Sequence, residues 1–321
     1  MSEIISLVLP FFGLIILGFV VAKFTEQPDG AMGWLNIFII YVSLPALFYK
    51  LLSNTPVEQF KRVDFLTTTT LVTFFIFYLI FLVGWVIRRN NIGDSTIQGL
   101  AAAYGNIGYM GPGMALLAFG EVAAIPVALI FCIENILHFT VAPLLMAFRG
   151  GDDQANYGDL AKKVIKNIIL HPFIIASFIG VIAAIYKIDL PDAADNIIDL
   201  LAQAAAPCAL FAMGVTLALR AIKRIPIEIF YITPIKLAIY PALTYVALSF
   251  VGDFDPIWVQ VAVLLASLPT ATNVFVIGQQ YDQWTERASA CVLITTICSI
   301  LTVSTWLWLF KSQTIPFDLF P

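Results

Sequence analysis

Charged residues are scarce in this sequence. Lys and Arg total 17 and Asp and Glu total 21 among 321 residues, so that 12% of the chain is charged and 60% is hydrophobic. An ordinary soluble domain carries about 25% charged residues, and the shortage therefore excludes one. The few basic residues form no stripe and the net charge is -4, so binding to nucleic acid is not expected. The composition predicts an integral membrane protein in a lipid bilayer.

Motifs of enzymes and of ATP-driven pumps are also absent. No glycine-rich loop ending in Gly-Lys-Ser or Gly-Lys-Thr occurs. Glu134 and His138 are four residues apart, but a zinc protease helix needs a second His, and the other histidine is His171. The four cysteines contain no Cys-x-x-Cys pair and are expected to be reduced packing residues. We therefore expect no catalytic residues, no metal site and no cofactor other than a coupling ion, and we do not predict an enzyme.

Long apolar runs fill the chain and are separated by short polar segments. A membrane-spanning helix needs about 20 apolar residues, and ten such runs are present. They cover residues 4–22, 31–52, 65–87, 97–119, 122–148, 164–186, 196–219, 229–251, 257–280 and 288–310. The first run lacks a small-residue cleavage pattern, so we expect a retained span rather than a signal peptide. The sequence predicts an all-α polytopic membrane protein with ten transmembrane helices in a single domain, residues 1–321.

Basic residues predict the orientation of these helices. Eleven Lys and Arg residues lie in loops on the side opposite the N-terminus, and five lie on the N-terminal side. Because loops rich in Lys and Arg stay in the cytoplasm, we expect both termini outside the cytoplasm and the longest loop, residues 150–163, inside it. The chain is expected in the cell inner membrane or the plasma membrane.

Proline and glycine recur at a fixed separation in the two halves of the chain. The pairs that are 162 residues apart are Pro10 and Pro172, Gly18 and Gly180, and Pro45 and Pro207. This spacing predicts two five-helix repeats, residues 1–150 and 163–311. Since five is an odd number, the second repeat enters the membrane in the opposite direction, which is typical of transporters that work by alternating access.

Helix-breaking residues interrupt two of the apolar runs at corresponding places in the two halves. Gly105–Gly113 contains four glycines and Pro112, and Ser267–Asn273 contains Pro269. Proline lacks an N–H and glycine weakens a helix, while backbone polar groups freed in a membrane must be received by protein or by a water-filled cavity. Paired interruptions of this kind predict the binding site of a transporter.

A family resemblance is carried by four segments, Leu35–Phe38, Ser43–Phe48, Asn106–Pro112 and Leu268–Tyr281. Taken together they resemble the auxin efflux carrier family, whose bacterial members include permeases for organic acids such as malate and malonate. The central loop of this chain is short, unlike the large cytosolic loop of the plant hormone carriers, which argues against auxin as the substrate.

The resemblance has consequences for the fold and its motion. It implies two inverted five-helix repeats whose broken helices 4 and 9 cross at Pro112 and Pro269. It also implies a scaffold of spans 1, 2, 6 and 7, a mobile unit of spans 3–5 and 8–10, and movement of substrate by an elevator or rocking step. A homodimer through the scaffold helices is expected.

The crossing of the two broken helices is expected to form an anion site. N–H groups of the half-helices that follow Pro112 and Asn273 would point into it and would favour a small carboxylate over a cation. The amides of Asn106 and Asn273 either hold the carboxylate or only cap the opened helix ends. Further candidates are Tyr109, Thr270 and Thr272 beside the breaks, and Ser43, which resembles the family position facing the crossing.

Three ionisable residues within spans are candidates for coupling to a proton or a sodium ion. Charges inside a membrane are costly and usually mark ion or substrate pathways. Glu134 is the preferred site, and His138 lies one turn further along the same helix face, where it either exchanges a proton or only packs. Lys236 either snorkels to the headgroups or pairs in the interior.

These features predict a secondary transporter that moves a small organic anion, a carboxylate, by alternating access. An anion channel is the alternative, but a channel needs a continuous polar pore, and the spans contain few polar positions. A membrane-embedded sensor would need a soluble output domain, for which the loops leave no room.

Overall fold

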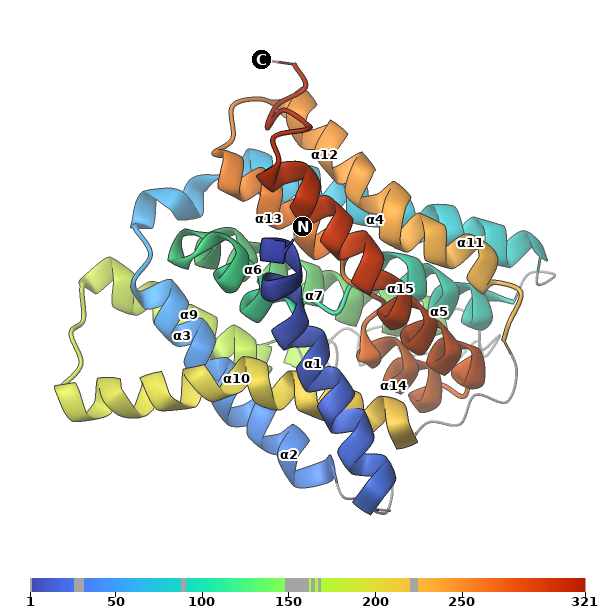
Figure 1. Ribbon diagram of the computed structural model, residues 1–321, viewed down its shortest axis with the longest axis horizontal. Helices are drawn as coiled ribbons and strands as arrows, with labels where there is room; N and C mark the ends of the chain where they lie inside the picture. Colours follow the sequence, from blue (N-terminus) through green and yellow to red (C-terminus); the bar gives the residue numbers. More distant parts are fainter. Residues whose placement is uncertain are drawn as a thin grey trace. The chain divides into compact units, whose positions relative to one another are not determined.

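The computed structural model of the protein describes residues 2–25, 32–87, 91–147, 162, 165–166, 169–219 and 225–320. Throughout these residues every regular element is a helix, and Figure 1 shows the helices with their labels. The predicted all-α class is therefore confirmed. Most of the predicted cytoplasmic loop, residues 150–161 and 163, lies outside the described residues, as do several of the basic residues from which the orientation was predicted.

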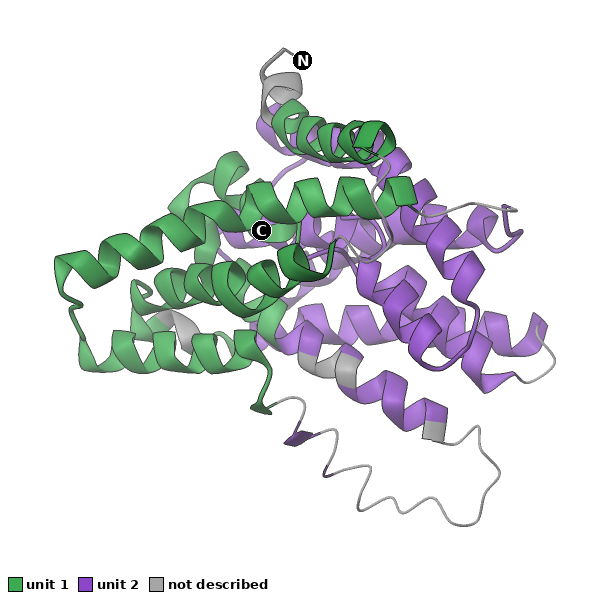
Figure 2. Cartoon of the chain, turned by 90° about the horizontal axis from the view of Figure 1, so that it is seen from below, with its two compact units in different colours: residues 1–63, 108–132, 169–221 green, residues 64–107, 133–168, 222–321 purple. Residues whose placement is uncertain are grey.

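The chain divides into two compact units, which Figure 2 colours green and purple. Unit 1 contains residues 1–63, 108–132 and 169–221, and unit 2 contains residues 64–107, 133–168 and 222–321. Each unit therefore draws on both predicted repeats. The helices of spans 1, 2, 6 and 7 fall in unit 1, together with the second half of the fourth span.

Unit 1 is built around two pairs of packed helices. Its elements are α1 (Ser2–Thr25), α2 (Gly33–Phe38), η2 (Ile39–Ser43), α3 (Leu44–Ser53), η3 (Val57–Lys61), α6 (Gly111–Phe119), η4 (Glu121–Ala123), the first part of α7 (Ala124–Ala147), α9 (Pro172–Tyr186) and α10 (Asp192–Leu219). The most extensive contacts join α1 to α10 and α3 to α9.

Glycine lets these helix pairs approach closely. A Cβ atom added to Gly18 of α1 would collide with the carbonyl oxygen of Phe211 in α10. A Cβ atom added to Gly180 of α9 would lie 3.0 Å from the carbonyl oxygen of Tyr49 in α3. The absence of a side chain at both positions therefore allows backbone to meet backbone.

The second span widens ahead of Pro45. Residues Ile39–Ser43 form a π-helix, η2, between α2 and α3. Pro45 has no N–H to continue the helical hydrogen bonds, and a π-turn is one way in which a helix accommodates an irregularity. The turn ends at Ser43, which is fully buried.

Unit 2 contains the remaining helices. Its elements are α4 (Val63–Ile87), α5 (Ile92–Ala103), the rest of α7, α11 (Ile229–Pro234), η6 (Ile235–Ile239), α12 (Tyr240–Val251), α13 (Pro256–Ser267), α14 (Thr272–Gln280) and α15 (Thr285–Lys311). The span predicted at 229–251 thus consists of α11, a π-helix and α12, and Pro241 follows this π-helix as Pro45 follows η2.

The two predicted interruptions are present as breaks between short helices. The predicted fourth span corresponds to α5 and α6, and the predicted ninth span corresponds to α13 and α14. The first helices, α5 and α13, have 12 residues each, and the second helices, α6 and α14, have 9 each.

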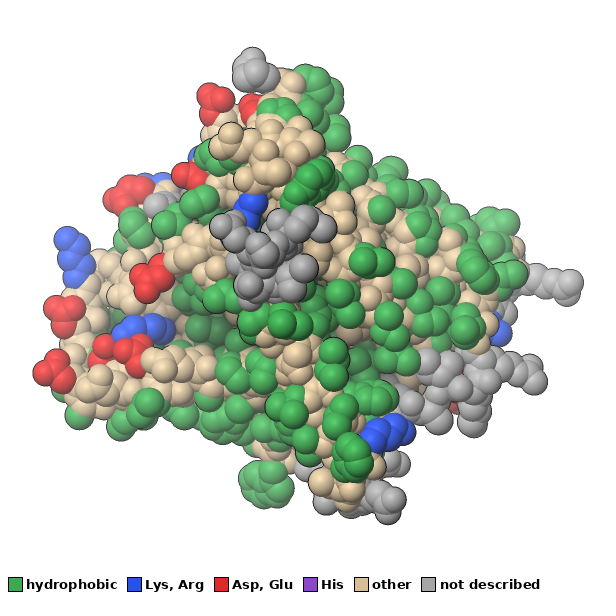
Figure 3. Space-filling view, in the orientation of Figure 1, with side chains coloured by type: hydrophobic (Ala, Val, Ile, Leu, Met, Phe, Trp, Pro, Cys, Tyr) green, Lys and Arg blue, Asp and Glu red, His purple; other side chains and the backbone are tan. Residues whose placement is uncertain are grey.

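Apolar surface marks the chain as a multi-pass membrane protein. Among the described residues, seven helices are long and apolar enough to cross a bilayer, and α9 and α13 are shorter apolar helices. On α4, exposed apolar side chains recur every three or four residues, so they form one stripe suited to lipid; they are Leu71, Phe75, Tyr78, Leu82 and Val86. Figure 3 shows hydrophobic side chains over much of the visible face.

Candidate functional site

The two helix breaks satisfy each other's backbone within unit 2. Gly105 and Thr270 form an isolated antiparallel bridge. The Asn106 N–H donates to the carbonyl oxygen of Pro269 at 2.8 Å, and the Ala271 N–H donates to the carbonyl oxygen of Tyr104 at 2.9 Å. Irregular backbone in a membrane needs such partners because hydrocarbon supplies none. Residues 104–106 and 269–271 therefore form one joined element.

Local sequence explains why the helices open at these positions. Leu268 precedes Pro269 and is extended, with φ −64° and ψ 150°, as the residue before a proline prefers to be. Gly105 leaves little room for a side chain, because an added Cβ would lie 3.1 Å from the Leu265 carbonyl oxygen and 3.2 Å from Lys236 Nζ. The break thus depends on a proline in one segment and on a glycine in the other.

A cluster of neutral polar side chains lies on this joined element. The Tyr104 hydroxyl donates to Asn135 Oδ1 at 2.7 Å and accepts a hydrogen bond from Asn273 Nδ2 at 3.1 Å. The Tyr104 ring stacks on the His138 ring, with centroids 4.0 Å apart and planes 9° apart. Thr270, fully buried, donates from Oγ1 to the carbonyl oxygen of Ala101 at 2.7 Å. One phenol thus connects both breaks to α7.

A charged cluster adjoins the neutral one. Lys236 is 0% exposed, so the snorkelling alternative is wrong. Its Nζ donates to the carbonyl oxygen of Ala266 at 2.8 Å and lies 4.5 Å from the centroid of the Tyr240 ring. Since Ala266 lies in the last turn of α13, the ammonium also stabilises the negative end of that helix.

Glu134 completes the charged cluster from α7. It is 6% exposed, and its Oε1 accepts hydrogen bonds from Thr73 Oγ1 at 3.0 Å and from the Tyr240 hydroxyl at 3.2 Å. The Thr73 and Tyr240 hydroxyls are 2.6 Å apart, and Glu134 and Lys236 both contact the Tyr240 side chain. Because Asn135 follows Glu134, α7 connects the charged cluster directly to Tyr104.

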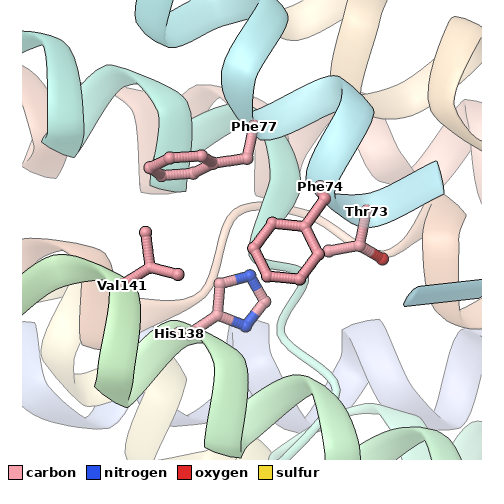
Figure 4. A pocket seen from close by; sticks show the side chains of 5 residues that line it. All are labelled: Thr73, Phe74, Phe77, His138 and Val141. Carbon is pink, nitrogen blue, oxygen red and sulfur yellow. The ribbon is translucent and has the colours of Figure 1, made fainter. Parts of the chain in front are cut away.

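A small pocket borders both clusters. It is lined by Thr73, Phe74, Phe77, His138 and Val141, whose side chains Figure 4 shows. Its space is that of about one water molecule. His138 therefore has one stacked face against Tyr104 and a border on this pocket, and the choice between packing and proton exchange stays a prediction.

The remaining predicted site residues lie in different places. Asn106 is 3% exposed. The N-cap residues of α6 and α14 make no side-chain cap, and the Asn273 amide binds Tyr104 instead, so Asn273 is not a helix cap. Thr272 begins α14, and its hydroxyl oxygen is buried and has no hydrogen-bond partner among the residues that the structure describes. Ser43, Tyr109 and Pro112 belong to unit 1, where the Ser43 hydroxyl likewise has no partner. A substrate role for any of these residues stays a prediction.

Four residues of these clusters were not predicted from the sequence. They are Thr73, Tyr104, Asn135 and Tyr240. Two of them had a usable signal: Tyr104 immediately precedes the break at Gly105, and Asn135 adjoins the intramembrane Glu134. For Thr73 and Tyr240 the sequence offers no such marker, because hydroxyl side chains are common in apolar helices.

Comparison with known proteins decides the family. A profile of the family described as "Membrane transport protein" matches residues 3–307. The chain belongs to this family. It is a transporter family rather than an enzyme family, and it is the auxin efflux carrier-like family that the motifs resemble, so both predictions are confirmed.

Individual relatives cover almost the whole chain. The chain is 60% identical over 321 residues, 100% of both chains, to a protein of Rhizobium meliloti (strain 1021) named "Putative malonate transporter". It is 24% identical over 296 residues, 91% of this chain and 94% of the other, to an "Uncharacterized transporter" of Methanothermobacter thermautotrophicus. It is 21% identical over 303 residues, 94% and 95% of the two chains, to "Uncharacterized transporter YfdV" of Escherichia coli (strain K12).

Proposed function

We propose that this chain is a secondary transporter that moves a small carboxylate across the cytoplasmic membrane by alternating access. The observation that carries the proposal is the joined element of residues 104–106 and 269–271, with the Asn273 amide beside it and a buried charged cluster behind it. Amide N–H groups suit a carboxylate, and discontinuous helices form the substrate sites of many secondary transporters. The name of the 60% identical relative makes malonate the first substrate to test.

Inverted repeats, and with them an elevator-like step, are supported by pairs of equivalent residues that share one separation in the sequence. Gly18 lies close to Phe211, and Gly180 lies close to Tyr49. Gly180 follows Gly18 by 162 positions, and Phe211 follows Tyr49 by the same 162 positions. The two broken spans also have equal helix lengths in the same order, 12 residues and then 9. A single repeated unit, used twice in opposite directions, accounts for both facts.

For the coupling ion we propose a proton, carried by Glu134. The ammonium of Lys236 already provides a positive charge at the end of α13, where an unwound transporter helix would bind a metal cation. The Glu134 carboxylate has two hydroxyl partners, Thr73 and Tyr240, that can pass a proton. Sodium then has no evident place in this cluster.

The proposal includes the setting of the protein in the cell. The excess of Lys and Arg in alternate loops supports a cytoplasmic membrane location with both termini outside. A homodimer through unit 1 follows from the family resemblance. Both statements are tested by labelling single cysteines from either side of the membrane and by the mass of the purified protein in detergent.

Uptake of labelled malonate into liposomes that contain the purified protein tests the function. The expected result is saturable uptake above that of empty liposomes, with an apparent affinity about 10- to 100-fold weaker in Asn273→Ala, because a hydrogen bond to a charged ligand is lost. Asn54→Ala, an exposed amide in unit 1, is the matched control. If no mono- or dicarboxylate is taken up above the level of empty liposomes, the proposed substrate class is wrong. Unitary currents in a planar bilayer would indicate a channel instead.

A further inference from the structure

Tyr104 is fixed in place at both ends of its backbone. Its N–H donates to the carbonyl oxygen of Leu100 at 2.7 Å and closes α5, and its own carbonyl oxygen accepts from Ala271 at 2.9 Å. The residue is 2% exposed. The side chain therefore starts from a rigid position between the two breaks.

The Tyr104 hydroxyl determines which way the Asn273 amide faces. A phenol has a single proton, and this proton is donated to Asn135 Oδ1. The hydroxyl can then only accept from Asn273, which must present Nδ2 to it. The Oδ1 atom and the second proton on Nδ2 are directed away from Tyr104. Without the hydroxyl, the amide could turn over with little difference in energy.

Ring and hydroxyl have separate roles at this residue. The ring stacks on His138, and such a stack depends on the aromatic ring rather than on its hydroxyl. Replacement by phenylalanine would keep the ring in its place and remove the hydrogen bonds of the hydroxyl, including those to Asn135 and Asn273. The position therefore allows an unusually clean test of what the hydroxyl does.

We propose that Tyr104 is a positioning residue that orients the Asn273 amide for the ligand and thereby strengthens ligand binding. The inference rests on the proposed function and adds a residue to it. Tyr104 itself does not touch the ligand, because its hydroxyl is buried between two amides. Asn135 acts through it in the same way, since its Oδ1 fixes the direction of the phenol proton.

Equilibrium binding of labelled malonate to the full-length protein in detergent tests this proposal. Tyr104→Phe is expected to weaken malonate binding about tenfold, because the Asn273 amide is no longer held in one orientation. Tyr245→Phe removes another buried phenol hydroxyl in unit 2, one bonded to the Pro316 carbonyl oxygen, and is expected to leave binding unchanged. Asn135→Leu, which removes the acceptor of the phenol proton, is expected to resemble Tyr104→Phe.

A double-mutant cycle separates positioning from a general structural effect. In an Asn273→Ala background, Tyr104→Phe is expected to cause no further loss of affinity, because the group that it orients is absent. An equal loss in both backgrounds, or full affinity in Tyr104→Phe, would overturn the role of Tyr104 while leaving the proposed function intact. Absence of any binding by the unmodified protein would instead remove the proposed function, and the role of Tyr104 with it.

Discussion

Replacing Lys236 by methionine removes a positive charge from the interior of unit 2 while nearly keeping the volume of the side chain. The ammonium is fully buried, bonded to the carbonyl oxygen of Ala266 and in contact with the Tyr240 side chain, which also contacts Glu134. After the substitution the carboxylate of Glu134 is buried without a compensating charge. The end of α13 loses its cation at the same time.

The expected cost follows from this burial. The hydrogen-bond partner of Lys236 Nζ is the Ala266 carbonyl oxygen, and leaving a buried polar group without its partner lowers the free energy of unfolding by about 1–3 kcal/mol. Lys50 offers a matched control in unit 1, where Nζ lies 2.7 Å from Asp195 and 2.9 Å from Asp199. The three side chains are 26%, 42% and 37% exposed, and ion pairs at such positions contribute about 0–1 kcal/mol. Lys50→Met should therefore be several-fold milder.

Reversible unfolding in mixed detergent micelles measures both effects. We expect Lys236→Met to be clearly destabilised, Lys50→Met to be near the unmodified protein, and the double variant Lys236→Met with Glu134→Gln to recover part of the loss. The reasoning is refuted if the two single lysine variants lose equal stability, or if the double variant is no better than Lys236→Met alone.

Three further predictions concern packing and coupling. Gly105→Ala places a Cβ against the Leu265 carbonyl oxygen and Lys236 Nζ and should reduce uptake sharply. Gly13→Ala is the control and should leave uptake unchanged, because no described atom lies within 4 Å of the added Cβ. Equal uptake in the two variants would count against the tight fit at the break. Gly18→Ala should lower the free energy of unfolding by about 1–3 kcal/mol through overpacking of α1 on α10, which chemical denaturation measures, and unchanged stability would contradict the close approach. Glu134→Gln should transport equally with and without an imposed pH gradient, whereas a retained response to the gradient would exclude Glu134 as the proton carrier.

Much of the fold could be predicted from the sequence because membrane helices follow local rules. Apolar length predicted the long helices, and proline and glycine predicted the breaks near Gly105 and Pro269. The grouping of helices depends on contacts between distant segments, and here α6 belongs to unit 1 while α5 belongs to unit 2. The ten-span inverted repeat itself remains a prediction supported by equal helix lengths.

The candidate site was only partly predictable. Glu134, His138 and Lys236 stood out because ionisable groups are rare in apolar helices. Whether Lys236 points inward depends on its depth and its neighbours, which one chain segment does not reveal. Tyr104 was missed because a tyrosine beside a helix break has the same sequence pattern whether it packs or organises two amides, and only the tertiary structure distinguishes these roles.

Counterflow in liposomes tests the central claim most directly. Liposomes containing the protein are loaded with unlabelled malonate, diluted into a trace of labelled malonate, and followed in time. A carrier with one alternately exposed site predicts that label transiently accumulates above its equilibrium level, and that Asn273→Ala reduces this peak. Label that merely equilibrates without an overshoot, in the unmodified protein and under saturating internal substrate, would contradict the account.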